Sequence, residues 1–135
     1  MSALAEAIYE ILRRQATLPE SRLSYAKLAQ ELRDRSAEFE DIHHRHRKLY
    51  LALGEVGAEC RRLGLPPLPA LVVRADTGRP GQAYYTGRCS GLSYQGEKVA
   101  AWRRDLEAVK SATYPCKPRH ARADPGPRGR TAGYR

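Results

Sequence analysis

The chain has 135 residues, with 24 lysines and arginines against 15 aspartates and glutamates, which gives a formal net charge of +9 at pH 7. This length fits one compact domain with an extension and excludes a barrel of eight βα units. The excess of positive charge favours a polyanionic partner: nucleic acid, a membrane surface or an acidic protein. No run approaches 18 consecutive apolar residues, so we expect no membrane-spanning helix.

Cysteine usage and the first residues of the chain predict a cytoplasmic protein. Cys60, Cys89 and Cys116 form an odd and widely spaced set, which does not fit a disulfide framework. The first residues show no basic segment followed by an apolar run, so we expect no secretory signal. No signature of an enzyme class is present, and we therefore expect a protein without catalytic residues and without a cofactor.

Hydrophobic periodicity predicts two helices in the first third of the chain. Between Ser2 and Gln15, apolar residues recur at intervals of three and four, as on one face of a helix. A shorter helix is expected after Ser24, which is a typical N-cap residue. Its predicted buried face consists of Tyr25, Leu28, Ala29 and Leu32. The polar run 33–35 is expected to form a turn.

A long third helix is predicted from Ser36, as its N-cap, to about Arg62, because an apolar seam continues through this range. Gly64 is well placed to end it, with Pro66 and Pro67 just beyond. The N-terminal part of this helix would carry a run of basic residues: His43, His44, Arg45, His46, Arg47 and Lys48.

Two extended segments are predicted after the third helix. Residues 70–75 are rich in β-branched side chains, and residues 82–86 can return beside them after the turn-forming run 76–81. Together they would form a β-hairpin with arginines near its tip.

A last helix and a basic tail are expected at the C-terminal end of the chain. Trp102 is the expected anchor of the helix at 97–112, with Arg103 and Arg104 pointing outward. Residues 113–135 contain four prolines and three glycines, together with six Lys or Arg residues against one Asp. We therefore expect a domain at 1–112 and an extended tail at 113–135, in which Tyr114 and Tyr134 are candidates for stacking on bases.

The order of three helices followed by a hairpin is that of a winged helix-turn-helix. The expected fold class is mainly α with a small β-hairpin: a winged helix-turn-helix-like domain, a C-terminal helix and the tail. In this architecture the third helix lies in a major groove and the hairpin touches the neighbouring backbone. The predicted nucleic-acid-binding residues are His43, His44, Arg45, Arg47, Lys48, Arg74, Arg79, Arg88, Lys117, Arg119, Arg122, Arg128 and Arg130.

These charges predict a non-enzymatic nucleic-acid-binding protein, with duplex DNA favoured over RNA. Arg45 and Arg47 are the candidates for base-edge contacts, and the other basic residues would neutralise phosphates. Three other interpretations stay open. A basic run is often only a solvated helical face, a winged domain can bind proteins instead of DNA, and the tail can be a passive extension.

Other reactive side chains are expected to have structural roles. His43 and His46 are three residues apart on one face of the predicted helix, a spacing that metals can use, but no Cys-x-x-Cys pair accompanies them. We therefore predict no metal site. Cys89 has no evident base to activate it as a nucleophile. Cys60 lies on the seam of the third helix and is expected to be buried.

Three short segments within residues 22–76 resemble one known family. Leu23–Ala29 (LSYAKLA), Ala52–Gly54 (ALG) and Leu71–Arg74 (LVVR) resemble the DNA-binding half of alkylguanine DNA alkyltransferases and alkyltransferase-like proteins. The resemblance implies DNA binding by a helix-turn-helix. Pro69 and Ala70 stand where that family has its reactive cysteine and the following histidine, so alkyl transfer is not implied.

A second block is similar to uncharacterised bacterial and phage proteins. It consists of Leu65–Val73 (LPPLPALVV), then Thr77–Gly78, Pro80–Gly81 and Tyr84–Tyr85, with a tryptophan in a later helix. The resemblance covers most of residues 22–110 and implies no particular activity. Its phage setting favours a role in a mobile element or in host defence. The alternative function is therefore to inhibit or adapt a host nucleoprotein complex by protein–protein contact.

Overall fold

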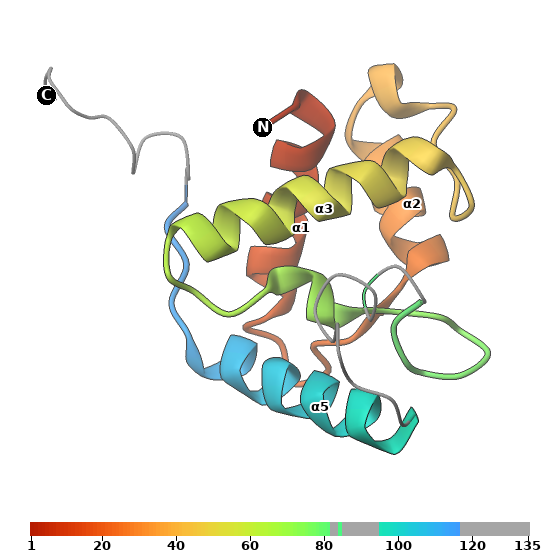
Figure 1. The fold of residues 1–135 in the computed structure, drawn as a ribbon. Helices are drawn as coiled ribbons and strands as arrows, with labels where there is room; N and C mark the ends of the chain where they lie inside the picture. The colour runs from red at the N-terminus through yellow and green to blue at the C-terminus, as the bar shows by residue number, and fades with distance from the viewer. Residues whose placement is uncertain (82–83, 85–94, 117–135) are drawn as a thin grey trace, which may run out of the picture.

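The computed structural model describes residues 1–81, 84 and 95–116 (Figure 1). It is mainly helical, with a small sheet of two short strands. The elements are α1 (Ala3–Gln15), β1 (Leu23–Ser24), α2 (Tyr25–Arg35), η1 (Ala37–Phe39), α3 (Arg47–Arg62), η2 (Leu68–Leu71), β2 (Val72–Val73) and α5 (Gln95–Ser111). In the described part of the chain, no helix has the length and apolar character needed to cross a membrane.

The first two helices begin where local capping chemistry predicts. The Ser2 hydroxyl accepts a hydrogen bond from the Ala5 amide at 3.1 Å, and the Ser24 hydroxyl accepts one from the Lys27 amide at 3.0 Å. The predicted buried face of α2 is confirmed. The predicted turn at 33–35 is wrong, since these residues form the last turn of α2. Arg33 and Arg35 lie in the last turn of α2, where a positive charge interacts favourably with the helix dipole. A polar run can therefore continue the helix.

The predicted start of the third helix is wrong. The Ser36 hydroxyl caps only the short helix η1, accepting from the Glu38 amide, and α3 begins eleven positions later at Arg47. Phe39 and Ile42, one or the other of which was expected to begin the seam of the helix, are both buried, but they reach the core from η1 and from the loop at residues 40–46. Their spacing continues the helical seam of α3, and this coincidence makes the loop look helical in the sequence.

The end of α3 is confirmed. Gly64 has a φ of +72°, a left-handed conformation that favours glycine. Its amide donates to the Arg61 carbonyl at 3.1 Å, and the Leu65 amide donates to the Cys60 carbonyl at 2.9 Å. These two bonds form a Schellman motif, which satisfies carbonyls that the helix itself leaves without donors.

The predicted β-hairpin is not found among the described residues. Val72–Val73 pairs in parallel with Leu23–Ser24 instead of with a following strand. Residues 68–71 form the helix η2, in which Pro69 lies in the first turn, so the extended segment is much shorter than expected. Of the expected returning strand, Tyr84 has a helical backbone, and the other residues lie outside the described part.

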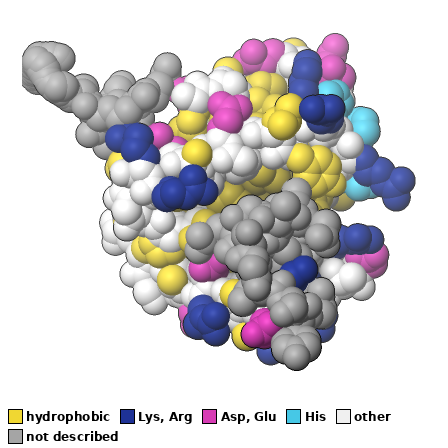
Figure 2. All heavy atoms as spheres, in the orientation of Figure 1, with side chains coloured by type: hydrophobic (Ala, Val, Ile, Leu, Met, Phe, Trp, Pro, Cys, Tyr) yellow, Lys and Arg dark blue, Asp and Glu magenta, His cyan; other side chains and the backbone are white. Residues whose placement is uncertain are grey.

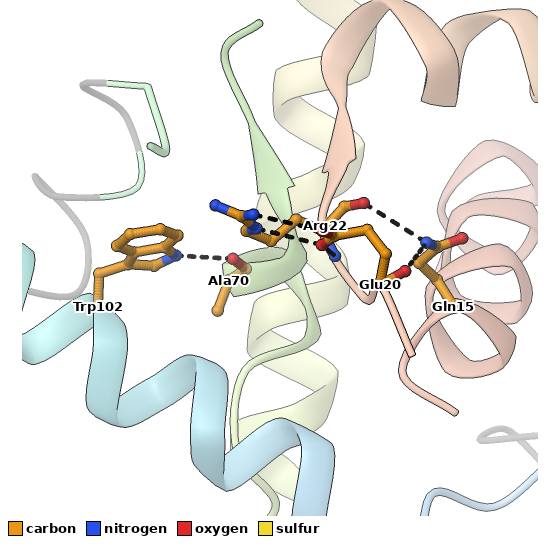
Figure 3. Close-up of polar contacts among 5 residues, drawn as sticks. All are labelled: Gln15, Glu20, Arg22, Ala70 and Trp102. Atoms are coloured by element: carbon orange, nitrogen blue, oxygen red, sulfur yellow. Dashed lines mark hydrogen bonds and ion pairs between the residues drawn. The ribbon is translucent and has the colours of Figure 1, made fainter. Parts of the chain in front are cut away.

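Helix α5 is held against the middle of the chain by Trp102. This side chain is 3% exposed, and its Nε1 donates to the Ala70 carbonyl at 2.8 Å (Figure 3). The anchoring role predicted for Trp102 is confirmed. Figure 3 also shows the turn between α1 and β1, where Gln15 donates to the Glu20 carbonyl at 2.8 Å and Arg22 pairs with the Glu20 carboxylate at 3.2 Å.

The residues after α5 pack onto the domain. Tyr114 is buried, and its hydroxyl donates to the Pro66 carbonyl at 2.6 Å. The Tyr9 hydroxyl donates to the Pro115 carbonyl, also at 2.6 Å. The prediction that Tyr114 stacks on bases is therefore wrong, because its ring is part of the core. These contacts place residues 113–116 beside the end of α3 (Figure 1). Tyr134 lies outside the described residues.

Candidate nucleic-acid interface

The predicted basic run lies mostly before α3 and not within it. His43, His44 and Arg45 belong to the loop at 40–46, whereas Arg47 and Lys48 form the first turn of the helix. All five side chains are exposed. Figure 2 shows the histidines together at one edge of the visible face, with Lys and Arg side chains beside them.

His46 has a structural role as the N-cap of α3. Its Nδ1 accepts a hydrogen bond from the Lys48 amide at 3.1 Å. The prediction that His43 and His46 share a helical face is wrong, because both precede the helix. Their rings nevertheless meet edge to face, with centroids 5.4 Å apart. The structure contains no group of three or more His, Cys, Asp or Glu side chains suited to a metal ion within its described ranges.

Side chains from α2 and α3 hold the loop at 40–46 in place. From α2, the Arg33 guanidinium donates to the Ile42 carbonyl at 2.5 Å. From α3, the Tyr50 hydroxyl donates to the His44 carbonyl at 2.9 Å. Within the loop, the His43 Nδ1 accepts from the Arg45 amide at 3.3 Å. The loop is therefore tied to both neighbouring helices and presents Arg45 to solvent from a defined backbone.

A second exposed segment, the turn at 74–79, is closed by its own backbone. The Arg74 amide donates to the Arg79 carbonyl and the Gly78 amide to the Arg74 carbonyl, both at 2.8 Å. Gly78 has a φ of +69°, which again favours glycine. Arg74 is exposed but paired with Asp76 at 2.8 Å, and this bond is the main reason why the pKa of the Asp76 carboxyl is lowered. Arg79 is exposed and has no ion pair with a described carboxylate.

Two tyrosines connect the loop at 40–46 with the turn at 74–79. The rings of Tyr25 and Tyr50 lie with their centroids 5.4 Å apart. The Tyr50 hydroxyl bonds to the loop, and the Tyr25 hydroxyl accepts from the Gly81 amide, just after the turn, at 3.0 Å. Both tyrosines also contribute to the raised pKa of Arg74, after the larger effect of Asp76. The loop, the first turns of α3 and the turn at 74–79 are therefore connected to one another through these two side chains.

The exposed face of α3 has uncharged side chains between basic ends. It follows the helical spacing of Arg47, Leu51, Gly54, Ala58 and Arg61, all of them exposed. Leu51 is 57% exposed, and a Cβ at Gly54 would meet no atom within 4 Å. Figure 2 shows Lys and Arg side chains at both ends of α3. This face was not predicted, although its spacing of three and four residues is visible in the sequence.

The carboxylates on α3 are engaged elsewhere. Glu55 accepts from the Ser2 amide at 2.9 Å and from the Ser2 hydroxyl at 3.0 Å. Glu59 is nearly buried and pairs with Arg62 at 2.5 Å. These contacts hold both carboxylates away from the exposed face of α3.

The loop is less positive than the basic run alone indicates. Glu38, Glu40 and Asp41 come just before the histidines and are exposed. They balance the formal charges of Arg45, Arg47 and Lys48, so residues 38–48 have no net charge while the histidines are neutral. The segment as a whole therefore does not attract a polyanion. Binding at this surface would depend on contacts with the individual side chains of Arg45, Arg47 and Lys48.

Several predicted residues lie outside the described part of the chain: Arg88, Lys117, Arg119, Arg122, Arg128 and Arg130, together with Cys89. Their assignments stay predictions. Cys60 is fully buried as expected, and burial raises the pKa of its thiol, so this side chain behaves as a small core residue.

Comparison of the chain with protein-family models, with curated proteins and with solved structures found no match. The geometry and charge of the exposed surface are therefore the observations that bear on function.

Proposed function

We propose that this chain is a non-enzymatic nucleic-acid-binding protein that prefers duplex DNA. In this proposal it contacts DNA through the loop at 40–46, the first turn of α3 and the turn at 74–79. The observation that carries the proposal is the link through Tyr25 and Tyr50, which connects two segments that are distant in sequence and that each carry exposed arginines. The tail would add sequence-independent phosphate contacts.

The proposed binding mode resembles that of a winged helix-turn-helix, with the turn at 74–79 in the place of the wing. Helix α3 would approach the major groove with its exposed face, and Arg45, Arg47 and Lys48 would contact phosphates or base edges at its N-terminal end. Leu51, Gly54 and Ala58 have no side-chain hydrogen-bonding groups, so the middle of α3 can make only apolar contacts with bases. We therefore expect weak sequence specificity.

The resemblance to alkyltransferase-type DNA-binding domains agrees with this proposal in one respect. Two of the three segments that carry it contain β1 and β2, which pair with each other in the register Leu23↔Val72 and Ser24↔Val73. The two segments that resemble this family are therefore also neighbours in space. Pro69 and Ala70 occupy the positions of the reactive groups, so the proposal includes binding without alkyl transfer.

The salt dependence of binding tests this function. Affinity for a fluorescent duplex is measured by anisotropy between 50 and 300 mM salt, a range of about sixfold. On duplex DNA each phosphate contact adds about 0.9 to the slope of log K against log salt. Replacing Arg45 and Arg47 by Gln is expected to reduce the slope by about 1.8. The control is Arg14→Gln with Lys110→Gln, which removes the same charge from exposed positions outside this surface.

Three outcomes would reject the proposal: no binding by the wild-type chain, a slope near zero, or an equal loss in the control variant. Parallel titrations with single-stranded DNA and RNA test the preference for duplex DNA. Tighter binding to either of these would overturn that preference while leaving nucleic-acid binding in place.

A second candidate function is contact with a host nucleoprotein complex. The exposed apolar middle of α3, in which Leu51 is the largest side chain, is the observation that favours it, because such a face fits a protein partner. Capture of a defined complex from nuclease-treated extract, lost in Leu51→Gln and retained in Arg45→Gln with Arg47→Gln, would support this function over the first. The opposite pattern would count against it.

A further inference from the structure

A basic cleft lies between the turn at 74–79 and the first half of α5. It has a volume of about 520 Å³ and is open to solvent. Arg79 lines it from the turn. The residues that line it from α5 are Gly96, Val99, Ala100, Arg103 and Arg104. The cleft therefore brings together three guanidinium groups from two segments that are separate in the sequence.

The way α5 is anchored explains why these arginines are exposed to solvent. Trp102 faces the core and bonds to the Ala70 carbonyl, and Val99 is buried one turn earlier. Arg103 and Arg104 follow Trp102 directly, and both are exposed. At Gly96 a Cβ would meet no atom within 4 Å, so the helix leaves open space beside the guanidinium groups.

The charges that line this cleft are not balanced by ion pairs. Four other described arginines pair with a carboxylate: Arg13, Arg22, Arg62 and Arg74. Like several exposed arginines elsewhere, Arg79, Arg103 and Arg104 have no ion pair with a carboxylate among the described residues; the cleft differs in gathering three of them. Guanidinium groups without a carboxylate partner in the described part of the chain are suited to phosphate oxygens, which they bind through paired N–H donors.

We propose that this cleft is a second phosphate-binding site, which holds the sugar–phosphate backbone of the nucleic acid. The inference rests on the proposed function and extends it. Arg79 belongs both to the turn at 74–79 and to the cleft, so the interface continues from α3 across the turn to α5. The contacts are to phosphates, so they increase affinity without selecting a sequence.

The test replaces Arg103 and Arg104 by Gln in the full chain and measures duplex binding against salt. Glutamine has nearly the same helix propensity as arginine and an uncharged side chain, so α5 is expected to stay folded, which circular dichroism checks. Loss of two phosphate contacts reduces the slope by about 1.8, which corresponds to a fall in affinity of up to about 60-fold at 0.1 M salt. The charge-matched control is again Arg14→Gln with Lys110→Gln.

Each outcome bears on the inference. An unchanged slope in the Arg103→Gln and Arg104→Gln double variant, beside a reduced slope in the Arg45→Gln and Arg47→Gln variant, overturns the cleft and leaves the proposed function. An equal reduction in the control shows a general effect of net charge and overturns the cleft as well. Absence of salt-dependent binding by the wild-type chain overturns both proposals.

Discussion

Alkaline pH is expected to destabilise the domain through two buried tyrosines that hold residues 113–116 in place. The Tyr9 and Tyr114 hydroxyls donate to the carbonyls of Pro115 and Pro66, each at 2.6 Å. Burial is the largest cause that raises the pKa of both phenols well above the ordinary value of 10.0. The folded state keeps these protons at a pH where the unfolded chain releases them. Their contribution to stability is therefore complete below pH 10 and is lost as the pH rises toward the folded-state pKa values.

The size of the effect follows from proton linkage. Above pH 10, each phenol that stays protonated only in the folded state lowers the free energy of unfolding with a slope that rises toward about 1.4 kcal/mol per pH unit as the unfolded phenol deprotonates. Replacing Tyr9 by Phe removes one such group and is expected to reduce the pH slope by that amount. Replacing Tyr9 and Tyr114 together is expected to reduce it by about 2.7 kcal/mol per pH unit.

Urea unfolding followed by circular dichroism, at intervals between pH 9.5 and about 11, measures these slopes. At neutral pH, Tyr9→Phe is expected to cost about 1 kcal/mol, because it removes a single hydrogen bond. If the wild-type and Tyr9→Phe chains lost stability in parallel above pH 10, the assignment of a protonated, buried phenol to Tyr9 would be refuted.

Two further predictions concern the packing of the domain. Replacing Trp102 by Phe leaves the Ala70 carbonyl without its donor and is expected to cost about 1–3 kcal/mol in urea unfolding, so a loss below about 0.5 kcal/mol would contradict the anchoring role. Replacing Gly64 by Ala places a Cβ at a φ of +72° and is expected to cost about 1 kcal/mol. Gly54→Ala is the matched control, because open space within a helix predicts a gain of up to about 1 kcal/mol. Equal effects at the two glycines, read as shifts in Tm, would contradict this reasoning.

Local features of the chain could be predicted because they depend on residues within one or two turns. Ser24 caps the helix that it precedes, and its hydroxyl needs only the amide three positions later. Gly64 ends α3 because only a residue tolerant of positive φ suits that position. The apolar faces of α1 and α2 follow from helical periodicity alone. In each case the interaction that decides the structure lies inside the segment that shows the signal.

Tertiary contacts decided the features that the sequence analysis missed. Phe39 and Ile42 match the period of α3 but are buried from outside it, because Arg33 and Tyr50 hold the intervening loop away from a helical path. Val72–Val73 pairs with Leu23–Ser24, a partner almost fifty residues earlier. Periodicity cannot identify such a partner, because it reports which residues are buried and not what covers them.

The distribution of charge also depends partly on the sequence and partly on the tertiary structure. The sequence by itself determined the amount of positive charge, a net +9, and its concentration around residues 43–48 and in the tail. Only the tertiary structure decided which of these charges are available to a partner. It pairs Arg74 with Asp76, and it gathers Arg79, Arg103 and Arg104 around one cleft without a described carboxylate partner. The physical reason is that an ion pair depends on the distance between two groups in space, which the packing of separate segments sets.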